Sequence, residues 1–182
     1  MGSEKPVGAG NQQESLSSEQ RKRWFLAGLV EGEGSVTLSI KAHPTARYGV
    51  YLQPEFFIYQ HRLRWSLLEM AAEFFQAGRI RPKPGNPDVL VFSILSCPAH
   101  EARVVPFLRD CGEFSARRRD YELFSEAVKL CRQGARSTRS GLVQLVDIAY
   151  AMNMNGKQRR LKREDLIDRI LRGHTPDTPR PE

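Results

Sequence analysis

Residues 26–35 read Leu-Ala-Gly-Leu-Val-Glu-Gly-Glu-Gly-Ser, an apolar helical run that ends in alternating acids and glycines. A glycine inside a helix lowers helix stability by about 1 kcal/mol relative to alanine, so the presence of Gly28 and Gly32 calls for an explanation. The absence of a Cβ lets another backbone pack directly against that face of the helix. Glu31 and Glu33 follow at the C-terminal end, where the helix dipole disfavours anions unless a cation lies nearby. The segment therefore predicts a close-packing helix that presents carboxylates to a metal ion; the alternative is an ordinary helix end with a glycine cap.

The chain around this segment predicts one helix followed by two strands. Ser17 and Gln20 form a capping box, which starts a helix that runs to about Glu31. Polar and apolar residues alternate over 35–41, as in a half-buried strand, and a second strand is expected over 48–59. Pro54 lies inside this second strand and cannot donate to a ladder, so it requires an edge position or a bulge.

The rest of the chain continues as a helix, two more strands and a series of helices. The turn residues of 84–87 separate the strands. The expected elements are a helix at 63–75, strands at 79–83 and 89–95, and helices at 98–108, 116–132, 141–152 and 162–171. This order predicts an α+β fold in which helices cover one face of the sheet and leave the other free. We expect residues 1–16 to be a disordered tail, 17–172 a single domain, and 173–182 a flexible tail rich in proline and threonine.

Composition is that of a globular protein with a polyanionic partner. The 182 residues are 40% hydrophobic and 27% charged, and the net charge of +7 favours a partner such as nucleic acid. Cys97, Cys111 and Cys131 form no Cys-x-x-Cys pair, which argues against a disulfide framework and a zinc site and for a reducing compartment. No apolar run approaches the roughly 18 residues of a membrane span, and the start is polar. We expect a protein that is not secreted and not membrane-bound, in the cytoplasm, at the bacterial nucleoid or in an organelle interior.

The ten-residue string resembles the LAGLIDADG motif of homing endonucleases at almost every position. Val30 replaces isoleucine, Gly32 replaces alanine, and Glu31 and Glu33 replace the two aspartates. The resemblance implies an α-β-β-α-β-β-α core, with a curved antiparallel sheet as a DNA-binding saddle and extra C-terminal helices. The motif occurs once, and single-motif members of the family are symmetric homodimers. Their motif helices pack on each other, which here implies an interface of Ala27, Gly28, Glu31 and Gly32.

The same resemblance implies the residues of the catalytic site. Glu33 and the backbone carbonyl of Gly32 are the expected ligands of Mg²⁺ or Mn²⁺. The role of Glu31 stays open between a metal-site acid and a structural carboxylate. Gln60 and Arg64 match the spacing of a glutamine and an arginine that lie beside the metal in homodimeric members. Arg117, at the start of a later helix, matches a family lysine, and arginine can only stabilise charge. For these three residues the alternative is an ordinary polar or charged surface position.

Strand alternation predicts the face that would read DNA. Arg79, Arg81 and Lys83 form a cationic stripe of period two. Arg and Lys in the major groove read guanine, and Gln reads adenine. The other residues that project to this face are Thr37, Ser39, Lys41 and His43 from the first strand and Tyr51 and Gln53 from the second. The basic run 157–163 would add phosphate contacts. The alternative is a solvated sheet face.

The function that the resemblance implies is site-specific cleavage of double-stranded DNA. An intron-encoded homing endonuclease of this type hydrolyses a long, near-palindromic target as a homodimer with a divalent metal. Two alternatives use the same scaffold: a maturase that binds the RNA of its host intron, and a DNA-binding protein that does not cleave. A basic ribosome-associated domain would explain the charge but not the glycines and acids of the motif.

Overall fold

The structure is a computed structural model that describes residues 16–43, 45–113, 115–152 and 161–172. The predicted tails lie outside these ranges except for Leu16, and so does most of the basic run 157–163. The first half of the chain forms α1 (Ser18–Glu33), β1 (Gly34–Ala42), β2 (Val50–His61), η1 (Arg62–Arg64), α2 (Trp65–Phe75), β3 (Arg79–Lys83) and β4 (Asn86–Ile94). The second half is helical, with α3 (Cys97–Ala99), η2 (His100–Val104), α4 (Val105–Cys111), α5 (Arg118–Arg132), η3 (Ala135–Ser137), α6 (Arg139–Ala151) and α7 (Arg163–Arg172). The predicted α+β fold and its core order are confirmed.

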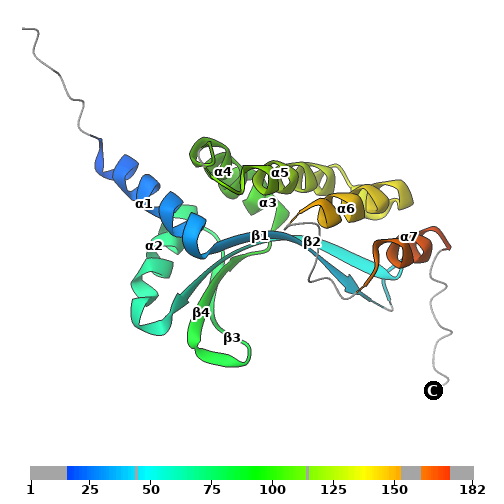
Figure 1. Cartoon of the computed structure of the whole chain (residues 1–182), viewed down its shortest axis with the longest axis horizontal. Coiled ribbons are helices and arrows are strands. Elements are labelled where there is room, and N and C mark those ends of the chain that lie inside the picture. The colour runs from blue at the N-terminus through cyan, green and yellow to red at the C-terminus, as the bar shows by residue number, and fades with distance from the viewer. Residues whose placement is uncertain (1–15, 44, 114, 153–160, 173–182) are drawn as a thin grey trace, which may run out of the picture.

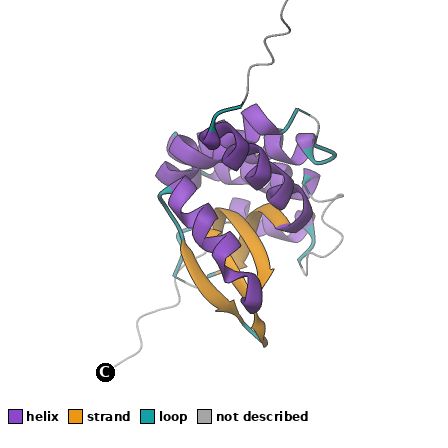
Figure 2. Cartoon of the chain, turned by 90° about the vertical axis from the view of Figure 1, so that its left-hand side faces the viewer, coloured by secondary structure: helices purple, strands orange, loops and turns teal. Residues whose placement is uncertain are grey.

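The antiparallel sheet has the strand order β1-β2-β4-β3. Most helices lie on one side of it, and in Figure 1 the β3–β4 hairpin curves away on the other side. Figure 2 shows the same gathering of helices from the left-hand side of that view. Alternate residues of the strands face the helices and form the core with α2, α5 and α6, among them Leu38, Phe56, Phe92, Phe75, Phe124 and Leu145. The side chains of the opposite face of the sheet are more exposed.

Two local predictions are confirmed, and one is refined. Ser17 and Gln20 form the capping box that starts α1, and β3 has the predicted bounds. Pro54 pairs with Leu38 of β1, whereas the ladder between β2 and β4 begins only at Phe56. The proline therefore lies in a part of β2 that has one neighbouring strand, so β2 is central in the sheet yet locally an edge at Pro54.

The helical run that follows β4 is confirmed, with one difference in detail. The helix predicted over 98–108 is a continuous run over 97–111 that consists of α3, η2 and α4, of which η2 is a π-helical turn. Pro98 lies in the first turn of α3, where a proline leaves no intrahelical donor missing, whereas Pro106 directly follows the π-helical turn inside the same helical run. The described residues contain no helix that is both long and apolar enough to cross a bilayer.

The junction of α1 and β1 depends on a glycine. Gly34 has extended dihedral angles and follows the helix directly, and a Cβ at this position would lie 2.5 Å from the Val30 carbonyl oxygen. We expect Gly34→Ala to lower the free energy of unfolding by about 1–3 kcal/mol, because backbone atoms must shift to admit the methyl group. Urea unfolding of this variant against Ser35→Ala, the next position on the outer sheet face, measures the effect. Equal stability of the two variants would contradict the close approach.

Candidate active site and nucleic-acid interface

The acidic end of α1 lies where the helix meets the sheet. Leu26 and Val30 anchor the helix in the core, while Glu31, Gly32 and Glu33 are exposed on its last turn. Gly34 then begins β1 without an intervening loop. The acids therefore lie at the junction between α1 and β1.

The two acids differ in their partners. The Glu31 carboxylate accepts hydrogen bonds from Ser115 Oγ at 2.6 Å and from the Tyr121 hydroxyl at 3.3 Å. Burial raises the pKa of Tyr121, which keeps its hydroxyl protonated as a donor. The Glu33 carboxylate receives no hydrogen bond or ion pair from any described residue. Glu31 is thus engaged within the chain, and Glu33 is available to an external ligand.

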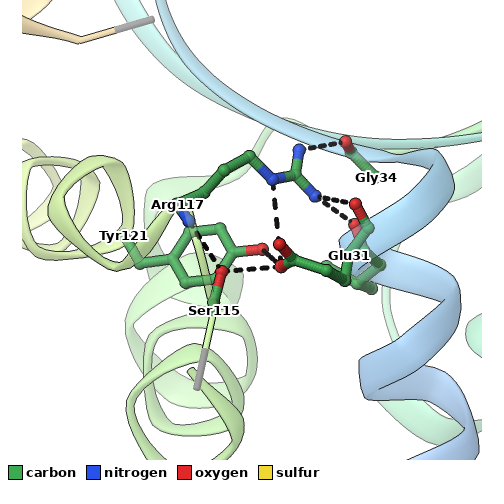
Figure 3. A network of polar contacts seen from close by, with 6 residues as sticks. Glu31, Gly34, Ser115, Arg117 and Tyr121 are labelled. Atoms are coloured by element: carbon green, nitrogen blue, oxygen red, sulfur yellow. Dashed lines mark hydrogen bonds and ion pairs between the residues drawn. The ribbon is translucent and has the colours of Figure 1, made fainter. Parts of the chain in front are cut away.

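Arg117 lies beside the motif, and its guanidinium faces the end of α1 (Figure 3). It donates to the Gly34 carbonyl at 2.6 Å, to the Glu31 carbonyl at 2.7 Å and to the Val30 carbonyl. Its Nε lies 3.9 Å from a Glu31 carboxylate oxygen. The cation that the dipole of α1 requires is therefore supplied from the start of α5, because α1 has no basic residue in its last turn.

Gln60 and Arg64 lie in the same region but do not contact the acids. Gly34 pairs with Ile58, so Gln60 lies two residues beyond this pair, at the end of the sheet that joins α1. Gln60 is only 7% exposed, on the helix-covered side of β2, and Arg64 is exposed at the start of α2. Across the described ranges, neither residue has a hydrogen bond or ion pair with Glu33. The pairing of Gly34 with Ile58 brings the backbone of Gln60 near the motif.

The polar residues predicted for the DNA-reading face lie together on the free side of the sheet. Cross-strand pairs join β1 and β2, namely Thr37 with Glu55, Ser39 with Gln53 and Lys41 with Tyr51. His43 lies just beyond β1 and is exposed. Gln53 also donates to the Leu95 carbonyl at 2.8 Å. The alternation along β1 and β2 thus produces one continuous polar surface.

The cationic stripe joins the same surface at its other edge. Arg79 pairs with Ser93 and Arg81 with Val91, which in turn pair with Phe57 and Tyr59 of β2. Lys83 Nζ lies 5.4 Å from the Tyr59 ring centroid, so it reaches the same face beyond the β-bulge at its strand end. All three cations are exposed. We call the free side of the sheet, with these cations, the open sheet face.

Sequence reasoning missed three members of the open sheet face, Glu55, Phe57 and Tyr59. Extending the alternation of Tyr51 and Gln53 along β2 would have found them. Glu55 is 8% exposed, accepts from Ser39 Oγ at 3.1 Å and lies 3.8 Å from Lys41 Nζ. Burial, and secondarily the Glu55 charge, raises the pKa of Tyr59, so this hydroxyl is a neutral group. The open sheet face therefore carries a carboxylate and aromatic rings as well as cations.

The outer side of α1 is apolar and has no partner within the described chain. Trp24 is 48% exposed and Phe25 is 53% exposed, although both are large hydrophobic side chains. A Cβ added at Gly28 or Gly32 would have no atom within 4 Å. Ala27 is partly buried and packs against the core. The helical glycines are therefore not required by packing inside the chain.

A divalent metal fits the donors at the end of α1. Among the described residues, no three His, Cys, Asp or Glu side chains gather as a metal site. The Glu33 carboxylate and the Gly32 carbonyl are both hard oxygen donors on an exposed turn. Mg²⁺ commonly takes one or two carboxylates and completes its shell with water and substrate phosphate oxygens. These donors suit Mg²⁺ or Mn²⁺ bound together with a phosphate.

The exposed cations of the open sheet face, together with the two acids at the end of α1, are features that suit a nucleic-acid-binding protein. The family model of the LAGLIDADG endonucleases matches residues 26–128. The chain belongs to this family. Relatives that it matches carry the names DNA endonuclease and homing endonuclease.

Relatives are found by sequence and by structure. DNA endonuclease I-CeuI of Chlamydomonas moewusii is 41% identical over 83 residues, which are 46% of this chain and 38% of that protein. Homing endonuclease I-ApeII of Aeropyrum pernix is 27% identical over 150 residues, which are 81% of this chain and 87% of that protein. The archaeal intron-encoded homing endonuclease I-Vdi141I, solved in complex with DNA, superposes with a TM-score of 0.77 and 26% identity. The superposition covers 85% of this chain and 98% of that one.

Proposed function

We propose that this protein is a homing endonuclease that cleaves both strands of a long, near-palindromic DNA site as a homodimer, with Mg²⁺ or Mn²⁺. The observation that carries the proposal is the contrast between the two motif acids. Glu31 is bound by side chains of its own chain, while Glu33, the residue directly before β1, is exposed and has no hydrogen bond or ion pair with any described residue. A DNA substrate requires a compartment that contains DNA, which favours the nucleoid or an organelle interior.

In this proposal one set of residues binds the DNA and another set hydrolyses it. The open sheet face lies in the major groove, where its cations contact guanine bases and phosphates. Glu33 and the Gly32 carbonyl would hold the metal, which would supply activation of water and neutralisation of charge on the scissile phosphate. Gln60 orients the attacking water through its amide, and Arg64 stabilises charge on the leaving group.

The proposed dimer interface is the apolar outer side of α1, and its occupant is a second copy of this chain. Gly28 and Gly32 are four residues apart and therefore lie on the same side of the helix. Trp24 and Phe25 flank them with exposed aromatic surface. Open space at both glycines allows another helix backbone to approach closely. A two-fold axis at this helix places a second Glu33 nearby and matches a two-fold DNA site.

Cleavage of a randomised duplex library by the full chain tests the proposed function. We expect one enriched site with two related halves, cut on both strands in Mg²⁺ and not cut in EDTA. Binding of a specific site without cutting in Mg²⁺ or Mn²⁺ would indicate a DNA-binding protein on this scaffold. Tight binding of structured intron RNA without any duplex cleavage would favour the maturase.

The cations of the open sheet face are expected to set the salt dependence of DNA binding. Replacing Arg79 and Arg81 together with glutamine should reduce the slope of log K against log [salt] by about 2, since each phosphate contact contributes about 0.9. Binding titrations over a range of KCl concentrations measure the slope. The control is Arg118→Gln with Arg132→Gln on α5, the same charge change on two ion-paired arginines away from the open sheet face. Equal slope changes in the two variants would count against DNA binding at this face.

A further inference from the structure

The last turn of α1 has carbonyl groups that its own helix cannot satisfy. The final carbonyls of any helix lack intrahelical donors and carry the negative end of the dipole. In α1 this end also carries Glu31 and Glu33, and the last turn has no basic residue. Its position therefore depends on a cation from elsewhere in the chain.

Arg117 supplies this cation, and the carbonyls to which it donates lie before and after the expected metal ligands in the sequence. Its two terminal nitrogens donate to the carbonyls of Val30, Glu31 and Gly34. Gly32 and Glu33 lie between these residues in the sequence. The guanidinium therefore donates to backbone carbonyls before and after the two residues that we expect to hold the metal. Figure 3 shows its contacts with Glu31 and Gly34.

Further contacts hold Arg117 and Glu31 in place. Ser115 Oγ donates to the Glu31 carboxylate at 2.6 Å and accepts the backbone N–H of Arg117 at 3.0 Å. Tyr121 donates to the same carboxylate, and its ring lies 5.8 Å from the guanidinium carbon of Arg117. The arginine side chain is 30% exposed. Both groups are therefore fixed by residues from the start of α5 and the loop before it.

We propose that Arg117 is a positioning residue, which fixes the last turn of α1 and thereby the Glu33 carboxylate and the Gly32 carbonyl. This inference rests on the proposed metal-dependent function. In it Arg117 positions the metal ligands and does not itself contact the scissile phosphate. The planar fork of arginine can serve several carbonyls at once, whereas the compact ammonium of lysine serves fewer at fixed angles. Glu31 belongs to the same network as the anion that orients the guanidinium.

The test compares Arg117→Ala, Arg117→Lys and the control Arg118→Ala, which removes the next arginine and its pair with Glu122. For Arg117→Ala we expect the Mg²⁺ concentration for half-maximal cleavage of the selected duplex to rise about tenfold or more. Its affinity for the same duplex in Ca²⁺ should stay close to that of the unmodified protein. Amide hydrogen exchange of residues 31–34 should become faster, and Arg117→Lys should be intermediate in both measurements.

Other results would overturn the inference. An unchanged Mg²⁺ requirement with a lower maximal rate would make Arg117 a direct participant at the phosphate. A loss of duplex affinity in Ca²⁺ with unchanged exchange at 31–34 would make it a DNA contact. Failure of the unmodified protein to cleave any duplex would refute the proposed function instead. Hydrogen exchange would still test the positioning role in that case, because it needs neither metal nor DNA, and Arg117→Lys serves if the alanine variant does not fold.

Discussion

Glu33→Gln is expected to lower the rate of DNA cleavage by about 10³-fold or more while leaving DNA affinity almost unchanged. The change replaces a carboxylate by a neutral amide of the same size, so the last turn of α1 keeps its shape. A metal that activates water contributes several kcal/mol of transition-state stabilisation, and each 1.36 kcal/mol is about tenfold in rate. Because Glu33 has no bonding partner among the described residues, the variant should remain as stable as the parent.

Single-turnover cleavage in Mg²⁺ and duplex binding in Ca²⁺ separate the two effects. Glu31→Gln is the matched control, because it makes the same chemical change two residues earlier in the same turn. An amide oxygen at residue 31 can still accept from Ser115 and Tyr121, so we expect a much smaller loss of rate. Specific cleavage that survives Glu33→Gln would remove this residue from the metal site.

Gly28→Gln is expected to abolish dimer formation and cleavage without harming the fold of the single chain. A side chain at this position meets no atom of its own chain within 4 Å, so it is accommodated in the monomer. Glutamine is a good helix former, and the folded monomer should gain roughly 0.5–1 kcal/mol from replacing glycine. The same side chain would hold two motif helices apart at the centre of the proposed interface.

Light scattering at micromolar concentration, with and without duplex, measures the dimer, and thermal unfolding measures the fold. Ser140→Gln, at an exposed position of α6, provides a control for an added glutamine on a helix surface. A Gly28→Gln protein that remains dimeric and cleaves both strands would place the interface elsewhere. Trp24 and Phe25 would then be exposed for another reason.

The strands and the start of α1 could be predicted because their signals are local. Alternation of period two placed Thr37, Ser39 and Lys41 on one face, and the pairing of β1 with β2 confirms this arrangement. The capping box depends only on Ser17 and Gln20, which lie within one turn. The helical run over 98–108 was predicted as one helix because no local pattern distinguishes a π-helical turn from an α-helix.

The contacts of the candidate site could not be predicted in the same way. The match to a family lysine at the start of a later helix located Arg117, but not the three carbonyls to which it donates. These bonds join residues that are more than 80 positions apart in the sequence. Every residue has a backbone carbonyl, so the sequence does not indicate which carbonyls accept a bond. The role of Glu31 stayed open for the same reason, since its donors Ser115 and Tyr121 belong to a distant segment.

The hydrogen bonds from Arg117 to the end of α1 also limit when, during synthesis, this helix end can reach its final conformation. The three bonds span 83, 87 and 86 residues, although α1 is the first helix of the described chain to leave the ribosome. Contacts of such separation form only after the intervening chain is available. A nascent chain that ends before residue 117 carries the whole motif with an uncompensated acidic helix end. Translation must therefore proceed beyond residue 117 before the end of α1 acquires the hydrogen bonds that we propose to position Glu33 and Gly32.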